Sequence, residues 1–118
     1  MSLRGEKMFY LLDDVDFLNS EKIYPLKQRE INEIVKKCGK FPINKLIVFG
    51  SSVTTSANPW SDIDIYIETQ EEDRKHFSEL QKNIKSPLDL WLSSEVDENL
   101  RTEILKKGVV VYECRQKK

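Results

Sequence analysis

Residues 62–68 alternate between two kinds of side chain, and this short pattern constrains the fold more than any other. Three isoleucines, Ile63, Ile65 and Ile67, alternate with the polar or aromatic residues Asp62, Asp64, Tyr66 and Glu68. Because successive side chains of a β-strand point to opposite faces, the isoleucines share one face and the two aspartates share the other. The pattern predicts a strand with one face on a core and an acidic second face.

Helix and strand patterns alternate along the rest of the chain. An apolar stripe at helical spacing predicts a helix over residues 26–38, which Pro25 opens and Gly39 closes. A β-rich apolar run predicts a strand over residues 45–49, ended by Gly50. The remaining patterns predict a charged helix from 71 to about 83, a strand over 87–93, a helix over 95–107 capped by Ser94 and ended by Gly108, and a strand over 109–112.

This order of elements predicts an α/β or α+β fold, with a small mixed sheet and its helices on one side. The 118 residues suffice for one compact domain, which we expect to span residues 21–118. Residues 1–20 stay unassigned, because Met8 to Leu12 fits a strand as well as a helical turn.

Charge and hydropathy exclude several kinds of partner. Lysine and arginine number 19 against 20 acidic residues, so no net positive field would draw the chain generally onto nucleic acid. The apolar run over residues 46–49 is far below the roughly 20 residues that span a bilayer, and the N-terminus lacks the apolar core of a secretory signal. We therefore expect a soluble, cytoplasmic protein. Cys38 and Cys114 indicate neither zinc nor a disulfide, and His76, in a charged stretch, is assigned no chemical role.

Carboxylates are the first part of a candidate site. Asp62 and Asp64 project from one strand face, and Asp89 projects from a second strand opposite its leucines. If the two strands are neighbours, the three acids converge with no lysine or arginine interleaved. A hard divalent ion with oxygen ligands would relieve their repulsion, and Mg²⁺ completed by substrate phosphates fits best.

Gly50, Ser51 and Ser52 are the second part, directly after a predicted buried strand. Glycine allows a sharp turn close to a ligand, and the following amides and hydroxyls can donate hydrogen bonds to phosphate oxygens. Phosphate on one side and metal on the other predict a nucleoside triphosphate site, in which Mg²⁺ promotes in-line displacement at phosphorus.

The sequence resembles the minimal nucleotidyltransferases of the polymerase-β-like superfamily. The resemblance runs from the helix before Lys45 to Tyr112. It rests on Phe49-Gly50-Ser51, Ser61-Asp62-Ile63-Asp64-Ile65, Leu88-Asp89-Leu90 and the closing helix and strand over residues 104–112. The resemblance implies the polymerase-β-like fold.

The same resemblance implies a role for each residue of the candidate site. Gly50 and Ser51 would hold the triphosphate, Asp62 and Asp64 would bind two Mg²⁺ ions, and Asp89 would bind metal or activate the acceptor hydroxyl. Where relatives often carry arginines and a glycine in the loop, this chain has Ser52, Thr54 and Thr55.

Two functions stay open at this point. The first is transfer of a nucleoside monophosphate, in the first place AMP from ATP, to a hydroxyl, since small members of the family often act as antitoxins that modify a tyrosine of a helical ribonuclease toxin. The second is a non-catalytic module that binds nucleotide or blocks a partner, which the arginine-poor loop favours. An oligomer is compatible with either function.

Three aromatic residues lie near the predicted site. Tyr66 and Trp91 share strand faces with Asp64 and Asp89, so each could stack on a base, although packing in a core is the commoner use of such side chains. Trp60 is open to two interpretations: a lid over the site, or a latch that holds its loop down. We favour the latch.

Overall fold

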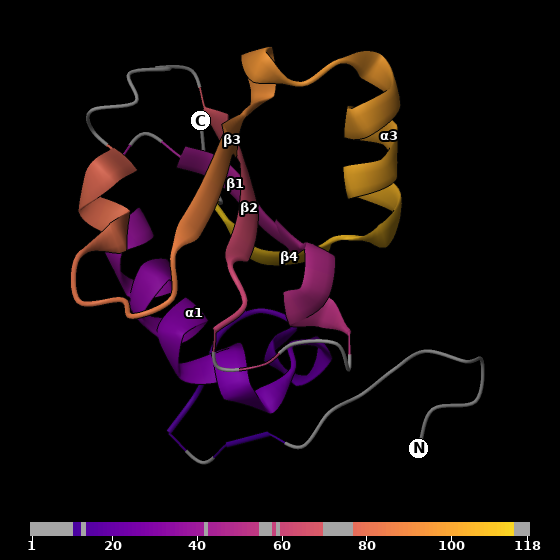
Figure 1. Cartoon of the computed structure of the whole chain (residues 1–118). Coiled ribbons are helices and arrows are strands. Elements are labelled where there is room, and N and C mark those ends of the chain that lie inside the picture. The colour runs from indigo at the N-terminus through magenta and orange to yellow at the C-terminus, as the bar shows by residue number, and fades with distance from the viewer. Residues whose placement is uncertain are drawn as a thin grey trace.

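A four-stranded sheet forms the centre of the part of the chain that the structure describes (Figure 1). In this computed structural model that part comprises residues 11–12, 14–41, 43–54, 58, 60–69 and 77–114. The strands are β1 (Ile43–Phe49), β2 (Ile63–Thr69), β3 (Leu88–Leu92) and β4 (Val109–Glu113), in the order β3-β2-β1-β4. β1 pairs antiparallel with β2 and β4, whereas β2 and β3 are parallel. The predicted mixed sheet is confirmed.

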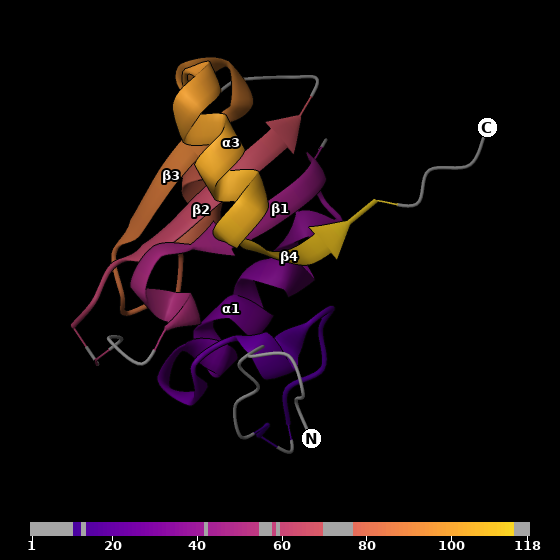
Figure 2. The same cartoon turned by 90° about the vertical axis from the view of Figure 1, so that its right-hand side faces the viewer.

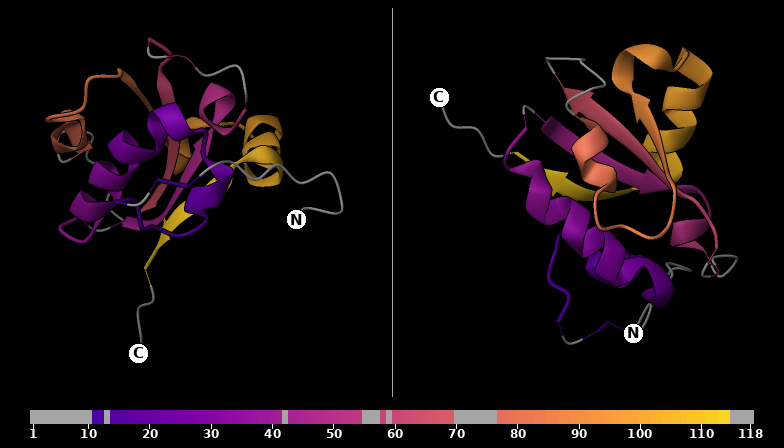
Figure 3. Two further views of the ribbon diagram at one scale, coloured as in Figure 1. Left: turned by 90° about the horizontal axis from the view of Figure 1, so that it is seen from below. Right: turned by 60° about the vertical axis from the view of Figure 1, so that its left-hand side comes forward.

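Helix α1 (Pro25–Cys38) covers one face of this sheet (Figure 3). Proline occupies its first turn, where its missing N–H would have had no partner within the helix. Ile31, Ile34 and Cys38 are fully buried and share a cluster with the three isoleucines of β2. Burying each isoleucine contributes roughly 1.5–3 kcal/mol, so this interface stabilises the packing of α1 on the sheet.

Helix α3 (Glu98–Lys107) covers the opposite face, as Figure 2 shows from the side of this helix. Ile104 packs there against Ile47 of β1, Tyr66 of β2 and Val96. The expectation that the helices lie on one side of the sheet is therefore wrong. The second face of the sheet is apolar beyond its acidic end, and this apolar part has to be covered from water.

The start of α3 also differs from the prediction. Asp97 is the N-cap, and its side chain accepts a hydrogen bond from the amide of Leu100 at 2.8 Å. Ser94, the predicted cap, lies one turn earlier in the 3-10 turn η4 (Ser93–Glu95). The buried Val96 separates the two segments in an extended conformation, so the helix can begin only after it.

Only the end of the predicted helix over 71–83 can be compared with the structure. Residues 71–76, which include His76, lie outside the described residues. The part that follows forms the short 3-10 helix η3 (Ser78–Gln81), and a hydrogen-bonded loop leads from it to β3.

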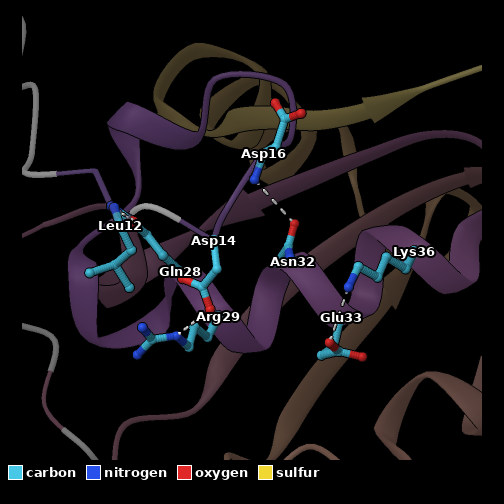
Figure 4. Close-up of polar contacts among 8 residues, drawn as sticks. All are labelled: Leu12, Asp14, Asp16, Gln28, Arg29, Asn32, Glu33 and Lys36. Carbon is cyan, nitrogen blue, oxygen red and sulfur yellow. Dashed lines mark hydrogen bonds and ion pairs between the residues drawn. The ribbon is translucent and has the colours of Figure 1, made fainter.

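The segment before α1 packs along that helix (Figure 4). The amides of Leu12 and Asp16 donate to the side chains of Gln28 and Asn32, at 3.0 and 3.4 Å. Farther along, Val15 and Phe17 are buried in the same cluster as α1. Part of this segment thus shares the core of the domain, while Asp14, Asp16 and Leu18 are exposed, and the domain boundaries stay a prediction. No helix among the described residues is long and apolar enough to cross a membrane.

Candidate active site

Asp64 of β2 lies directly beside Asp89 of β3. The parallel register pairs these two residues, with Ile63 and Leu88 before them and Ile65 and Leu90 after them. Register partners on parallel strands carry their side chains on the same face of the sheet, so the two carboxyl groups lie close together. β2 and β3 are therefore neighbours, which is the condition under which the sequence analysis expected the acids to converge. Asp62, the third predicted acid, is exposed at the entrance to β2.

The surroundings of Asp64 favour its protonated form. Its pKa rises from 3.8 to about 6, first because of burial and then because of the charge and the hydrogen bond of Asp89. The charge of Asp62 raises this pKa further. Two carboxylates that share a site cannot both ionise without a penalty, and a cation between them would remove it.

Gly50 places the backbone of the adjoining loop against this acid pair. It follows Phe49, the register partner of Asp64 on β1, and adopts a left-handed φ of +78°. A Cβ atom at Gly50 would lie 2.2 Å from Oδ2 of Asp64, so any other residue here would force the Asp64 carboxylate to move. Glycine is thus required both by the turn and by the close approach of backbone and carboxylate.

The loop after Gly50 forms the 3-10 turn η2 (Gly50–Val53). Ser51 is half-buried, and its carbonyl accepts hydrogen bonds from the amide and the hydroxyl of Thr54, both at 3.0 Å. Ser52 is fully buried, and its carbonyl accepts from the amide of Tyr24 at 2.9 Å. The Ser52 hydroxyl has no partner among the described residues. Thr55 lies outside the described residues, and the phosphate-binding roles of Gly50, Ser51 and Ser52 stay predictions.

The acid pair fits a magnesium ion in part. No group of three or more acidic, histidine or cysteine side chains within the described ranges has a geometry that could hold a metal ion. Mg²⁺ is usually held by one or two carboxylates together with waters and substrate phosphates. Asp64 and Asp89 supply two such carboxylates, and Asp62 lies close enough to raise the pKa of Asp64.

Comparison with known proteins identifies the family. The model of the family described as "Polymerase beta, Nucleotidyltransferase" matches residues 29–117, most of the chain. The chain belongs to this family. The resemblance noted in the sequence is thereby confirmed, and the chain is a nucleotidyltransferase.

The fold of this nucleotidyltransferase is similar to that of a solved structure. That structure is described as tri-AMPylated Shewanella oneidensis HEPN toxin in complex with MNT antitoxin. The match has a TM-score of 0.57 and 21% sequence identity, and it covers 76% of this chain and 75% of that chain. No curated protein matches the chain at a significant level.

Two of the aromatic residues pack between the sheet and α3. Tyr66 is 1% exposed in the second cluster, and its hydroxyl accepts a hydrogen bond from Nε of Arg101 at 3.2 Å. The half-buried Trp91 packs against the same cluster, and its Nε1 is buried without a partner in the described part of the chain. Tyr66 is therefore a packing residue rather than a platform for a base.

Trp60 is 83% exposed, so the interpretation of this residue as a latch is wrong. Its amide donates to Oδ1 of Asn58 at 2.8 Å, and the Asn58 amide donates to the Ser61 hydroxyl at 3.0 Å. These two hydrogen bonds hold the backbone here, while the indole ring stays largely exposed.

Three polar residues close to the site were missed in the sequence: Lys27, Glu30 and Ser86. Lys27 of α1 is fully buried and contacts the segments that lead into β2 and β3. A signal for it did exist, because Lys27 precedes Ile31 by one helical turn and extends the buried stripe of Ile31, Ile34 and Cys38. A lysine in such a stripe needs buried partners, and the sequence did not show which residues these would be.

Proposed function

We propose that this nucleotidyltransferase moves a nucleoside monophosphate, in the first place AMP from ATP, to a hydroxyl group with the help of Mg²⁺. The observation that carries this proposal is the Asp64–Asp89 pair, held in register on parallel strands with the backbone of Gly50 against it. An acid pair beside a tight glycine turn suits a metal–phosphate substrate, since the acids attract the ion and the turn admits the phosphates.

Each residue has a role in this reaction. Gly50 and Ser51 would hold the triphosphate, while Asp62 and Asp64 would hold the metal, whose charge would stabilise the phosphates during transfer. Asp89 takes the proton of the acceptor hydroxyl. The hydroxyl oxygen then forms a bond to the α-phosphorus, the bond from this phosphorus to the bridging oxygen of the β-phosphate breaks, and pyrophosphate leaves.

We further propose a protein acceptor, namely a tyrosine of a helical toxin. The solved structure with the similar fold contains an AMPylated toxin together with its antitoxin. A tyrosine hydroxyl on a partner suits a site at an open end of the sheet, since Asp62 and Asp89 are both exposed. The cytoplasmic location stays a prediction.

A non-catalytic role has one observation in its favour. The described part of the loop, residues 50–54, carries no cation, and the two lysines that could substitute lie elsewhere. Lys45 pairs with Glu113 at 3.9 Å, and Lys85 lines a cavity of about 620 Å³ beside α1. Triphosphate binding would then rest on the metal and on backbone amides.

Transfer of label tests the proposal. The purified chain is incubated with α-³²P-labelled ATP, with and without a HEPN toxin as the acceptor protein, in Mg²⁺ or in EDTA. We expect labelled toxin only with Mg²⁺ and the parent chain, and none with Asp64→Asn. Binding of ATP that is equally tight in EDTA, without transfer, would support the non-catalytic module instead.

A further inference from the structure

Lys27 is a charged residue in a place where a charge requires compensation. The side chain is fully buried on the face of α1 that lies against the core. Its ammonium donates hydrogen bonds to the carbonyl of Ser61 and to the hydroxyl of Ser86, both at 2.7 Å. A buried ammonium is stable only when such partners replace the hydrogen bonds that it makes to water.

Glu30 completes the network from the next turn of the same helix. Its carboxylate accepts from the Ser86 hydroxyl at 2.6 Å and from the Ser86 amide at 2.8 Å. Ser86 is 3% exposed and joins the two charged side chains through its hydroxyl. Lys27 and Glu30 stand three residues apart on the helix, a spacing at which both can reach one point. The network is therefore balanced in charge and closed by short hydrogen bonds.

The two backbone segments that this network holds are the entrances to the acidic strands. Ser61 directly precedes Asp62, and Ser86 lies three residues before Asp89. The entrances are also joined to each other, since the amide of Ile63 donates to the carbonyl of Pro87 at 2.9 Å. Gln81 holds the second entrance from the other side, through the Ser86 carbonyl and the Leu88 amide, both at 2.9 Å.

Helix α1 also anchors the other end of the glycine loop. The amide of Tyr24, the N-cap of α1, donates to the carbonyl of Ser52 at 2.9 Å. One helix end thus holds η2, the entrance to β2 and the entrance to β3. These segments carry every residue of the candidate active site.

We propose that Lys27, Ser86 and Glu30 form a positioning network that sets Asp89 against Asp64 for the transfer reaction. The inference rests on the function proposed above. β3 is the edge strand of the described sheet and pairs with β2 alone over five residues, so its position depends in part on the hydrogen bonds at its entrance, those of the network and those of Gln81. A misplacement of about 1 Å at a reacting group can reduce a rate roughly a hundredfold, so small shifts of this edge strand are expected to affect turnover strongly.

Steady-state kinetics of toxin labelling provide the first test, with a matched control on the same helix. Lys27→Met removes the ammonium but keeps the buried stem, and Ser86→Ala removes only the linking hydroxyl. We expect kcat to fall by tenfold or more in Lys27→Met and by threefold or more in Ser86→Ala, with the Kd for Mg²⁺-ATP within threefold of the parent. Ile34→Ala, which shortens a fully buried apolar side chain of α1 that takes no part in the hydrogen-bond network, is expected to keep parental kcat at temperatures where it is folded.

Amide hydrogen exchange provides a second test that needs no activity. In Lys27→Met without ligand, the Ile63 amide, bonded to Pro87, is expected to lose at least tenfold more protection than the amides where β1 pairs with β4. Ile34→Ala is expected to lower protection in both places equally. Equal losses in Lys27→Met, or a kcat within twofold of the parent, would overturn the positioning role. If the parent itself transfers no label, the proposed function fails, and the exchange result alone decides whether the network positions the strands.

Discussion

Replacing Asp64 by asparagine should stabilise the metal-free protein at neutral and alkaline pH. The carboxyl of Asp64 is partly buried beside Asp89, and its pKa in the folded protein is about 6, against an ordinary 3.8. A raised carboxyl pKa means that the folded state holds its proton more tightly than the unfolded state does. Stability from this group is therefore complete below about pH 4 and is lost as the pH rises through 6.

The size of the effect follows from the shift. A shift of about 2 pH units corresponds to about 3 kcal/mol, which is an upper bound because Asp64 still touches water. After allowance for solvent screening, we expect about 1–2 kcal/mol at pH 8. For a domain of this size, that gain raises the melting temperature by roughly 3–10 °C. Asparagine keeps the shape of the side chain, so no new cavity offsets the gain in stability. Its amide group can also donate a hydrogen bond to Asp89.

Thermal unfolding followed by circular dichroism between pH 4 and pH 8, in EDTA, measures this effect. Asp62→Asn is the matched control, with the same chemical change on the same segment at an exposed position, and should shift stability by less than about 0.5 kcal/mol. The advantage of Asp64→Asn should disappear toward pH 4, where the parent carboxyl is protonated. A variant that melts lower than the parent at pH 8, or a gain that persists unchanged at pH 4, would refute the electrostatic explanation.

Three further predictions concern the site and its surroundings. Gly50→Ala should lower both the melting temperature and the affinity for Mg²⁺-ATP, because its Cβ would meet Oδ2 of Asp64 at 2.2 Å. Gly39→Ala, with open space around it, should change neither. Calorimetry and melting curves of the two variants measure this. Asp64→Asn should weaken Mg²⁺-ATP binding and transfer together. Asp89→Asn should keep Mg²⁺-ATP binding within a few-fold of the parent and lower the transfer rate by about 10²–10⁴-fold. Loss of Mg²⁺-ATP binding in Asp89→Asn would make Asp89 a metal ligand instead. Burial raises the pKa of the Cys38 thiol to about 12, so a thiol reagent at pH 8 should modify the exposed Cys114 first, and rapid modification of both would contradict the buried position of Cys38.

The sheet could be predicted because its strands follow simple periods. The isoleucines of β2 alternate strictly, and strands of period two fix which side chains share a face. The sequence did not show that Ile47 and Tyr66 would create a second core beneath α3, since half-buried strands and strands covered on both faces differ only in a few apolar positions. For the same reason the start of α3 was misplaced, because Val96 is held in that second core and delays the helix until Asp97.

The candidate site was predictable only where local pattern determines geometry. That Asp64 and Asp89 lie close together was predictable from alternation on two strands and the assumption that these strands are neighbours, whereas the register that pairs the two residues was not predicted. The contacts of Lys27 join residues 34 and 59 positions apart, and no local period encodes them. Such contacts nevertheless leave a trace, since a lysine in an apolar stripe violates binary patterning and requires a compensating partner. In this chain the partners of Lys27 are the Ser61 carbonyl and the Ser86 hydroxyl, at the entrances to the two acidic strands. The lysine in the apolar stripe therefore lies where α1 contacts the segments that carry the candidate site.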